Sequence, residues 1–253
     1  MDVTQLAVER AINTMWKRYE EPLSLDNIAD SAILSKFYFS RTFRAATGTS
    51  PGRFLSAIRL FRAKNLLLKT GMSVTDIAYS VGYNSLGTFT SRFARSVGTS
   101  PGRYRLLSQD GLHALGGRPP QPGHRGTITG SIRVPETDKP IRIYVGAFRS
   151  PVVEGLPAAC AVLDSSGGFT LAHVPRGTWC VHAAAVAMRD LDPRPWLRKP
   201  LYLGRGERLT VEPDAMPWTS HIRLRPMSTV DTPILLALPE LDNWGAPKLT
   251  GVA

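Results

Sequence analysis

The chain has few cysteines and no long apolar run. Its 253 residues hold only Cys160 and Cys180, too few for a disulfide framework. No stretch approaches the ~18 uninterrupted apolar residues of a membrane span. The N-terminus MDVTQLAVER lacks the basic start and apolar core of a signal peptide. These absences predict a soluble, cytoplasmic protein without a membrane partner.

Negative charge is scarce. The chain carries 31 Lys and Arg against 20 Asp and Glu, which gives a formal net charge of +11 and a pI near 10.1. Most of the excess lies in residues 1–108, with fifteen basic residues against seven acidic ones. A surface of this sign favours an anionic partner, either nucleic acid or an acidic membrane surface.

Clusters of catalytic or metal-binding residues are also lacking. His173, Cys180 and His182 could gather with Cys160 around a metal, but their spacing matches no zinc motif. A Cys160–Cys180 redox pair is a second alternative, and two buried apolar thiols are the reading we favour. We therefore predict no metal, no cofactor and no enzymatic activity.

The chain contains an internal repeat of roughly 35 residues. GTSPGR occurs at 48–53 and at 98–103, and LDNIADSA in the first copy is echoed by VTDIAYSV in the second. Capping Ser24 and Ser73 begin the two copies, and glycines end their second helices. Each copy predicts a short helix, a turn and a second helix, near 35–47 and 85–97, with a connecting helix between the copies.

The second part of the chain has a different period. Residues 109–125 are rich in Gly and Pro and read as a linker. Short alternating segments separated by Gly/Pro turns then predict an all-β sandwich over 126–253. TPILLALPEL, at 232–241, is expected as a last strand or as an arm packed on the sheet. The expected fold is thus α+β in two domains, an all-α double helix-turn-helix domain over 1–108 followed by the β domain.

A helix-turn-helix unit places its second helix in the major groove of DNA. The connecting helix spans roughly 27 Å at ~1.5 Å per residue, and successive major-groove faces lie about 34 Å apart. Two copies in one chain could therefore read two successive faces.

Residues 5–107 resemble the AraC/XylS-type transcriptional regulators. The resemblance rests on SKFYFSRTFRAATGTSPGRF at 35–54 and SVTDIAYSVGYNSLGTFTSRFARSVGTSPGRYR at 73–105. Residues at the family's core and turn positions are Ile77, Ala78, Gly82, Tyr83, Phe89, Phe93, Gly98, Pro101 and Tyr104. The resemblance implies a bacterial, sequence-specific DNA-binding transcriptional regulator whose partners are duplex DNA and RNA polymerase.

The resemblance also implies DNA-contacting positions. Base-facing residues are Lys36, Phe37, Ser40 and Arg41 in the first copy, and Leu86, Gly87, Thr88, Thr90 and Ser91 in the second. Phosphate contacts are assigned to the side chains of Arg44 and Arg92. Backbone amides near Leu25, Val74 and Thr75 are further candidates, because helix N-termini attract anions.

The two copies differ in their reading helices. The first has SRTF at 40–43, whereas the second has TSRF, which moves its arginine one step along the helix. One step is a rotation of about 100°. Arg41 could therefore make a bidentate contact to guanine, while Arg92 reaches a phosphate. The first copy is expected to specify sequence, and the second to anchor and read DNA shape.

Basic residues on the connecting helix have a simpler interpretation. Arg59, Arg62, Lys64 and Lys69 are expected mostly as a solvated face, with phosphate contact as the minority alternative. DNA-repair methyltransferases can carry the same helical unit with a reactive cysteine, but neither cysteine here lies in their Pro-Cys-His-Arg context.

Motifs at 126–132 and 168–183 weakly resemble carboxypeptidase-regulatory and transthyretin-like β-sandwiches. Such a domain could bind a small-molecule or protein effector, form a homodimer or contact the polymerase. Trp179, Trp196, Trp218 and Trp244 are expected mainly in its core, with a ligand pocket as the alternative. The alternative function for the whole chain is a general or architectural nucleic-acid-binding protein without a sensed ligand.

Overall fold

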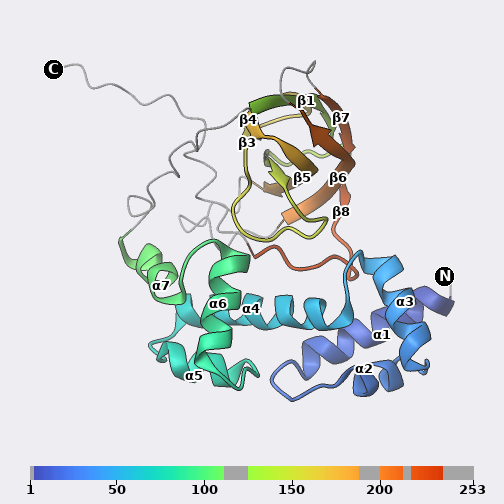
Figure 1. Cartoon of the computed structure of the whole chain (residues 1–253), viewed down its shortest axis with the longest axis vertical. Coiled ribbons are helices and arrows are strands. Elements are labelled where there is room, and N and C mark those ends of the chain that lie inside the picture. Colours follow the sequence, from blue (N-terminus) through green and yellow to red (C-terminus); the bar gives the residue numbers. More distant parts are fainter. Residues whose placement is uncertain (1–2, 111–124, 188–199, 213–217, 236–253) are drawn as a thin grey trace. The chain divides into compact units, whose positions relative to one another are not determined.

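The computed structural model describes residues 3–110, 125–187, 200–212 and 218–235 (Figure 1). The described residues form two compact units. The first comprises residues 3–109 together with the short segments 152–155 and 228–235, and the second comprises the rest. The predicted linker 109–125 lies for the most part outside the described residues.

Seven helices make up most of the first unit. They are α1 (Val3–Lys17), α2 (Leu25–Ser31), α3 (Lys36–Thr47), α4 (Pro51–Lys69), α5 (Val74–Ser80), α6 (Leu86–Val97) and α7 (Pro101–Asp110). The Ser24 hydroxyl accepts the Asn27 N–H in a capping box, and the Ser50 hydroxyl accepts the Arg53 N–H at 3.4 Å. Gly48 and Gly98 end α3 and α6 in the left-handed conformation, with φ of 75° and 97°. The repeated hexapeptide is therefore a helix stop followed by a helix start, as the sequence predicts.

Each copy of the repeat closes around three aromatic rings. Phe39, Phe43 and Phe54 pack in the first copy, with ring centroids 5.4 and 5.5 Å apart. Phe89, Phe93 and Tyr104 repeat this arrangement in the second copy, at 5.6 and 5.6 Å. Because these rings are almost fully buried, they orient α3 and α6 and leave the opposite faces of both helices free.

The turn between the two helices of each copy requires a left-handed residue. In the second copy this residue is Gly82, with φ of +85°. In the first copy the same position holds Ile33, with φ of 58° and a side chain that is 78% exposed. A β-branched residue is strained in this conformation.

We expect Ile33→Gly to raise the free energy of unfolding by about 1 kcal/mol, because the relief of strain outweighs the added flexibility of the unfolded chain. Urea unfolding measures the change, with Ile33→Ala as the control that keeps a Cβ and gains less. A loss of stability in Ile33→Gly would show instead that contacts of the Ile33 side chain stabilise the turn.

The second unit is strand-rich. Its strands are β1 (Arg125–Arg133), β2 (Ile141–Phe148), β3 (Cys160–Leu163), β4 (Gly167–Pro175), β5 (Gly177–Ala187), β6 (Pro200–Val211), β7 (Trp218–Arg223) and β8 (Arg225–Pro226). They form one sheet in the order β4-β1-β7 and a second in the order β3-β2-β5-β6-β8. Both sheets contribute to one apolar core that includes Ile128 and Phe169 from the first sheet and Ile143 and Val181 from the second.

The expectation for the C-terminal arm was wrong over residues 232–235. These residues belong to the first unit rather than to either sheet. The Leu235 carbonyl oxygen accepts a hydrogen bond of 2.7 Å from the ammonium group of Lys64 on α4. Lys64 is only 6% exposed. A buried ammonium needs an acceptor, and the arm supplies one.

Candidate nucleic-acid interface

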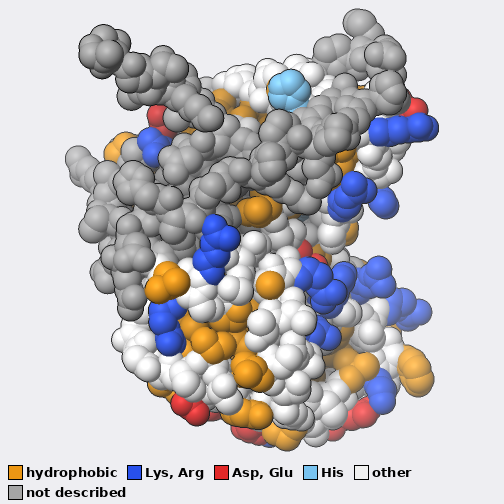
Figure 2. Space-filling model, turned by 60° about the vertical axis from the view of Figure 1, so that its left-hand side comes forward, with side chains coloured by type: hydrophobic (Ala, Val, Ile, Leu, Met, Phe, Trp, Pro, Cys, Tyr) orange, Lys and Arg blue, Asp and Glu red, His pale blue; other side chains and the backbone are white. Residues whose placement is uncertain are grey.

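The predicted reading residues of α3 occupy one arc of the helix. Phe39 and Phe43 point into the core, while Lys36, Phe37 and Arg41 are exposed and Ser40 is half-buried. Phe37 is 86% exposed, which is unusual for a phenyl ring. Figure 2 shows one face of the molecule, on which basic side chains reach the surface with hydrophobic ones between them.

Two cations on α3 have local partners. The Lys36 ammonium group lies 2.9 Å from a carboxylate oxygen of Asp26. The Arg41 guanidinium lies 5.7 Å from the centre of the Tyr38 ring. Both Lys36 and Asp26 are exposed, so solvent screens this ion pair and it can exchange for a phosphate or a base. Arg44, predicted to contact a phosphate, is exposed on the same arc about one turn beyond Ser40.

In α6 the corresponding arc carries few charges. Leu86, Gly87, Thr88 and Ser91 are exposed, and Thr90 is half-buried. The Ser85 hydroxyl accepts the Thr88 N–H at 3.4 Å and so caps this helix. Because these residues offer methyl groups, hydroxyls and close backbone approach, the arc suits shape and methyl contacts better than bidentate hydrogen bonding.

Arg92 is exposed on the flank of α6. It lies about 100° around the helix from Ser91, on the side that faces α4. The one-step shift between SRTF and TSRF therefore moves a guanidinium off the reading arc.

The N-termini of α2 and α5 have matching caps. The Ser24 hydroxyl accepts from the Asn27 N–H, and the Ser73 hydroxyl accepts from the Asp76 N–H at 3.0 Å. These caps satisfy the third amide of each helix, so the preceding amides, of Leu25 in α2 and of Val74 and Thr75 in α5, keep no intrahelical acceptor. Asp26 and Asp76 add negative charge to the same helical turns, which opposes phosphate binding there.

Arg59 of α4 joins the two copies. Its guanidinium donates two hydrogen bonds of 2.7 Å, to the carbonyl oxygens of Tyr19 and Glu21. It also lies 5.9 Å from the centre of the Tyr83 ring, whose hydroxyl is 3.0 Å from that of Ser56. Burial raises the pKa of the Tyr83 phenol and lowers that of Arg59. The segment before α2 is thus held against the turn before α6.

Most basic residues of the connecting helix are structural. Arg62 lies 5.2 Å from the ring centres of both Trp16 and Tyr19, and the buried Lys64 ammonium group lies 5.5 Å from that of Tyr104. The prediction that these basic residues form a solvated face is therefore wrong for Arg59, Arg62 and Lys64. Of the four residues it named, only Lys69 is exposed. Sequence spacing could not show this, because their partners lie elsewhere in the chain.

The cysteines do not form a redox pair. Both are free, and they lie on β3 and β5, at opposite edges of β2. Strands two apart are separated by about 10 Å. A disulfide needs Cα atoms within about 7 Å. Cys160 and Cys180 therefore cannot be bridged in this fold.

The metal alternative also lacks a constellation. In the described part of the chain, no three His, Cys, Asp or Glu residues gather as a metal site would need. Burial and the nearby charge of Arg205 lower the pKa of His182 to about 4, so this imidazole is neutral at physiological pH. None of the described helices combines the length and apolarity that crossing a membrane requires.

The expected tryptophans are partly accounted for. Trp179 is buried in the core of the second unit, and its indole N–H donates to the Pro175 carbonyl at 2.7 Å. Trp218 packs half-buried against the same core. Trp196 and Trp244 lie outside the described residues.

Comparison with known proteins finds sequences similar to the helical repeat. Residues 28–106 match a family model described as a helix-turn-helix domain. This segment is similar to the DNA-binding regions of AraC-type transcriptional regulators. The comparisons do not support the weak resemblance of the second half to carboxypeptidase-regulatory and transthyretin-like domains.

Among curated relatives, the transcriptional regulator Rob of Salmonella typhimurium is 37% identical over 101 residues, which are 40% of this chain and 34% of Rob. The bifunctional transcriptional activator/DNA repair enzyme AdaA of Bacillus subtilis is 30% identical over 93 residues, 37% of this chain and 44% of AdaA. A solved transcriptional regulator with an AraC-type DNA-binding domain, from Chromobacterium violaceum, is 29% identical over 43% of this chain and 96% of that chain, with a TM-score of 0.39. The matched segment spans 34% of the length of Rob and 44% of the length of AdaA, so this chain covers less than half of each curated relative.

Proposed function

We propose that the protein is a sequence-specific transcription regulator that reads two successive major-groove faces of duplex DNA with α3 and α6. The observation that carries the proposal is the repeated geometry of the first unit. In both copies a buried aromatic pair fixes the reading helix, while the predicted base-facing arc stays accessible to a ligand. The similarity of residues 28–106 to transcription regulators supports the same conclusion.

The two copies divide the work of recognition in this proposal. In α3, Lys36, Phe37, Ser40 and Arg41 contact base edges, and Arg44 lies close to them. In α6, the arc from Leu86 to Ser91 reads methyl groups and groove shape, and Arg92 contributes charge from the flank. The amides of Leu25, Val74 and Thr75 are proposed as further phosphate contacts, which the charges of Asp26 and Asp76 weaken.

The second half is proposed as a non-enzymatic β-sandwich that regulates the first, with a domain division at 1–108, 109–125 and 126–253. Two sheets around a shared core support the sandwich. Effector binding, self-association and contact with RNA polymerase are the roles proposed for it. Cytoplasmic location follows from the proposed contact with chromosomal DNA.

Selection of bound duplexes from a random library tests the sequence-specific proposal. We expect enrichment of one motif covering roughly two major-groove turns, and affinity that falls steeply with salt. Excess random DNA should leave binding to the selected motif intact. Enrichment of no motif, with equal competition by random DNA, would support the architectural alternative instead.

We expect Arg41→Ala to weaken binding to the selected motif by about 10- to 100-fold and to relax base preference at one position, because a bidentate base contact is lost. Arg92→Ala should weaken binding to all duplexes about equally. Affinities for the motif and its single-base variants, measured by fluorescence anisotropy, separate the two effects. Arg10→Ala, on the exposed face of α1, is the control. Uniform weakening by Arg41→Ala would contradict the proposed division.

A further inference from the structure

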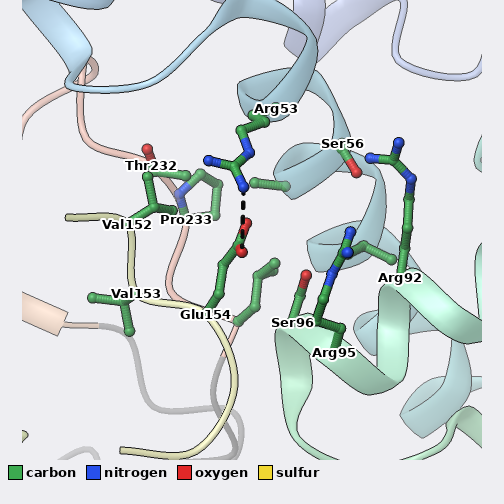
Figure 3. Close-up of a pocket in the computed structure, with 13 residues that line it drawn as sticks. Arg53, Ser56, Arg92, Arg95, Ser96, Val152, Val153, Glu154, Thr232 and Pro233 are labelled. Atoms are coloured by element: carbon green, nitrogen blue, oxygen red, sulfur yellow. Dashed lines mark ion pairs between the residues drawn. The ribbon is translucent and has the colours of Figure 1, made fainter. Parts of the chain in front are cut away.

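A cavity of about 30 Å³ lies inside the first unit between α4 and α6. Arg53 and Ser56 line it from α4, and Arg92, Arg95 and Ser96 line it from α6. The segments 152–154 and 232–235 form its remaining walls. Figure 3 shows the Arg53 side chain of α4 pointing toward Glu154, while the side chains of Arg95 and Arg92 rise from α6, with that of Arg92 beside Ser56.

The cavity has an excess of positive charge. Its only described carboxylate is that of Glu154, which is 25% exposed and lies 3.9 Å from the Arg53 guanidinium. Neither Arg92 nor Arg95 forms an ion pair with any residue in the described ranges. Three arginines and one carboxylate thus line the cavity. A guanidinium group binds oxyanions through paired N–H donors.

The position of Glu154 is fixed by the next residue, Gly155. The Gly155 N–H donates a hydrogen bond of 3.0 Å to the Ser96 carbonyl near the end of α6. Gly155 has a φ of +67°, and a Cβ there would lie 2.9 Å from the Arg95 carbonyl oxygen. Only glycine meets both conditions, so the backbone of this short segment fits the end of α6 closely.

The internal repeat provides a comparison. Fifty residues earlier, the same flank of α3 carries Thr42, Ala45 and Ala46, which line an open hollow of about 480 Å³ together with Val230. That flank has no charge at these three positions. The flank of the second copy differs by two arginines, although the fold of the two copies is the same.

We propose that the cavity between α4 and α6 is a binding site for a small oxyanion of the phosphate or sulfate class, held by Arg53, Arg92 and Arg95, with the Glu154 carboxylate as its built-in competitor. A cavity of this size holds about two water molecules. A tetrahedral oxyanion therefore enters when the Glu154 side chain moves out, and its binding loosens the segment 152–155. This site shares Arg92 with the proposed phosphate contacts of α6 but contains no residue of the proposed base-facing arcs.

The test uses the full chain without DNA. Inorganic phosphate and sulfate are titrated by calorimetry against chloride at matched ionic strength. We expect saturable binding that Arg95→Ala weakens about tenfold, because a charge-assisted contact is lost. Glu154→Gln and Gly155→Ala should both tighten anion binding. Glu154→Gln removes the competing charge, and Gly155→Ala displaces the Glu154 side chain from the cavity without a change of charge. Arg10→Ala is the control for net charge.

If Arg95→Ala and Arg10→Ala reduce the anion affinity equally, the result would mean an adventitious ion only and would overturn the proposal. The same holds if neither Glu154→Gln nor Gly155→Ala changes the anion affinity. A phosphate of the DNA backbone carries the same chemistry, so a second arm measures duplex affinity. Absence of free-anion binding, with Arg95→Ala reducing affinity for every duplex and lowering the salt slope by about one, would assign the arginines to DNA and overturn the site. Failure to select any DNA motif while phosphate still binds would overturn the proposed function alone.

Discussion

Gly82→Ala should lower the free energy of unfolding of the first unit by about 3 kcal/mol. An alanine at a φ of +85° is itself strained by about 1 kcal/mol. Its Cβ would also lie 2.7 Å from the Tyr19 carbonyl oxygen and 2.8 Å from that of Glu20. Both obstacles are backbone atoms, so the turn before α6 must move away from the segment before α2. Urea unfolding of the full chain, followed by helical circular dichroism, measures the loss.

Gly71→Ala is the matched control, because a Cβ at Gly71 would meet nothing within 4 Å. We expect a change within about 0.5 kcal/mol there. Equal stability of the Gly82 and Gly71 variants would show that the turn and the segment before α2 separate at little cost, and that the two copies are not rigidly joined.

Arg59→Ala should cost about 3 kcal/mol of stability, since two charge-assisted hydrogen bonds to backbone carbonyls are lost and both carbonyls are left without this donor. Arg59→Lys should recover only part of this loss, because one ammonium cannot reproduce the two-pronged geometry of a guanidinium. Lys69→Ala, at an exposed position on the same helix, is the control and should change stability little.

We also expect Arg59→Ala to change the preference of the protein for the spacing of its two contacted regions on DNA. The contacts of Arg59 with both copies of the repeat should set the relative orientation of α3 and α6. Arg59→Ala should then bind duplexes in which the two contacted regions are moved one base pair apart, and the parent protein should not. The measurement is affinity for a spacing series, at a temperature where both proteins are folded. An unchanged spacing preference in a destabilised Arg59→Ala would leave Arg59 a purely structural residue.

The parts of the fold that sequence analysis predicted are those encoded locally. Gly48 and Gly98 end helices because a left-handed stop is a property of the residue itself. Phe39 and Phe43 are four residues apart, so their common buried face follows from helical geometry. Strand β3 (Cys160–Leu163) has the sequence CAVL, in which polar and apolar residues do not alternate, so periodicity does not indicate this strand.

The parts that were missed depend on partners distant in the sequence. Arg59 finds its acceptors 38 and 40 residues away, and Lys64 finds one 171 residues away. A basic residue on an amphipathic helix looks the same in sequence whether water or a carbonyl satisfies it. The Arg53–Glu154 pair is hidden in the same way, because its carboxylate comes from a segment that sequence assigns to the other half of the chain.

The long reach from Lys64 to Leu235 has a consequence for synthesis. At roughly 5–20 residues per second, the ribosome makes the intervening chain in roughly 10–30 seconds. Throughout that time the Leu235 carbonyl, one of the groups that Lys64 contacts, does not yet exist. The first unit includes residues 228–235 and is therefore complete only after residue 235 has emerged. A product of premature termination before this point contains α3 and α6 but not the complete unit.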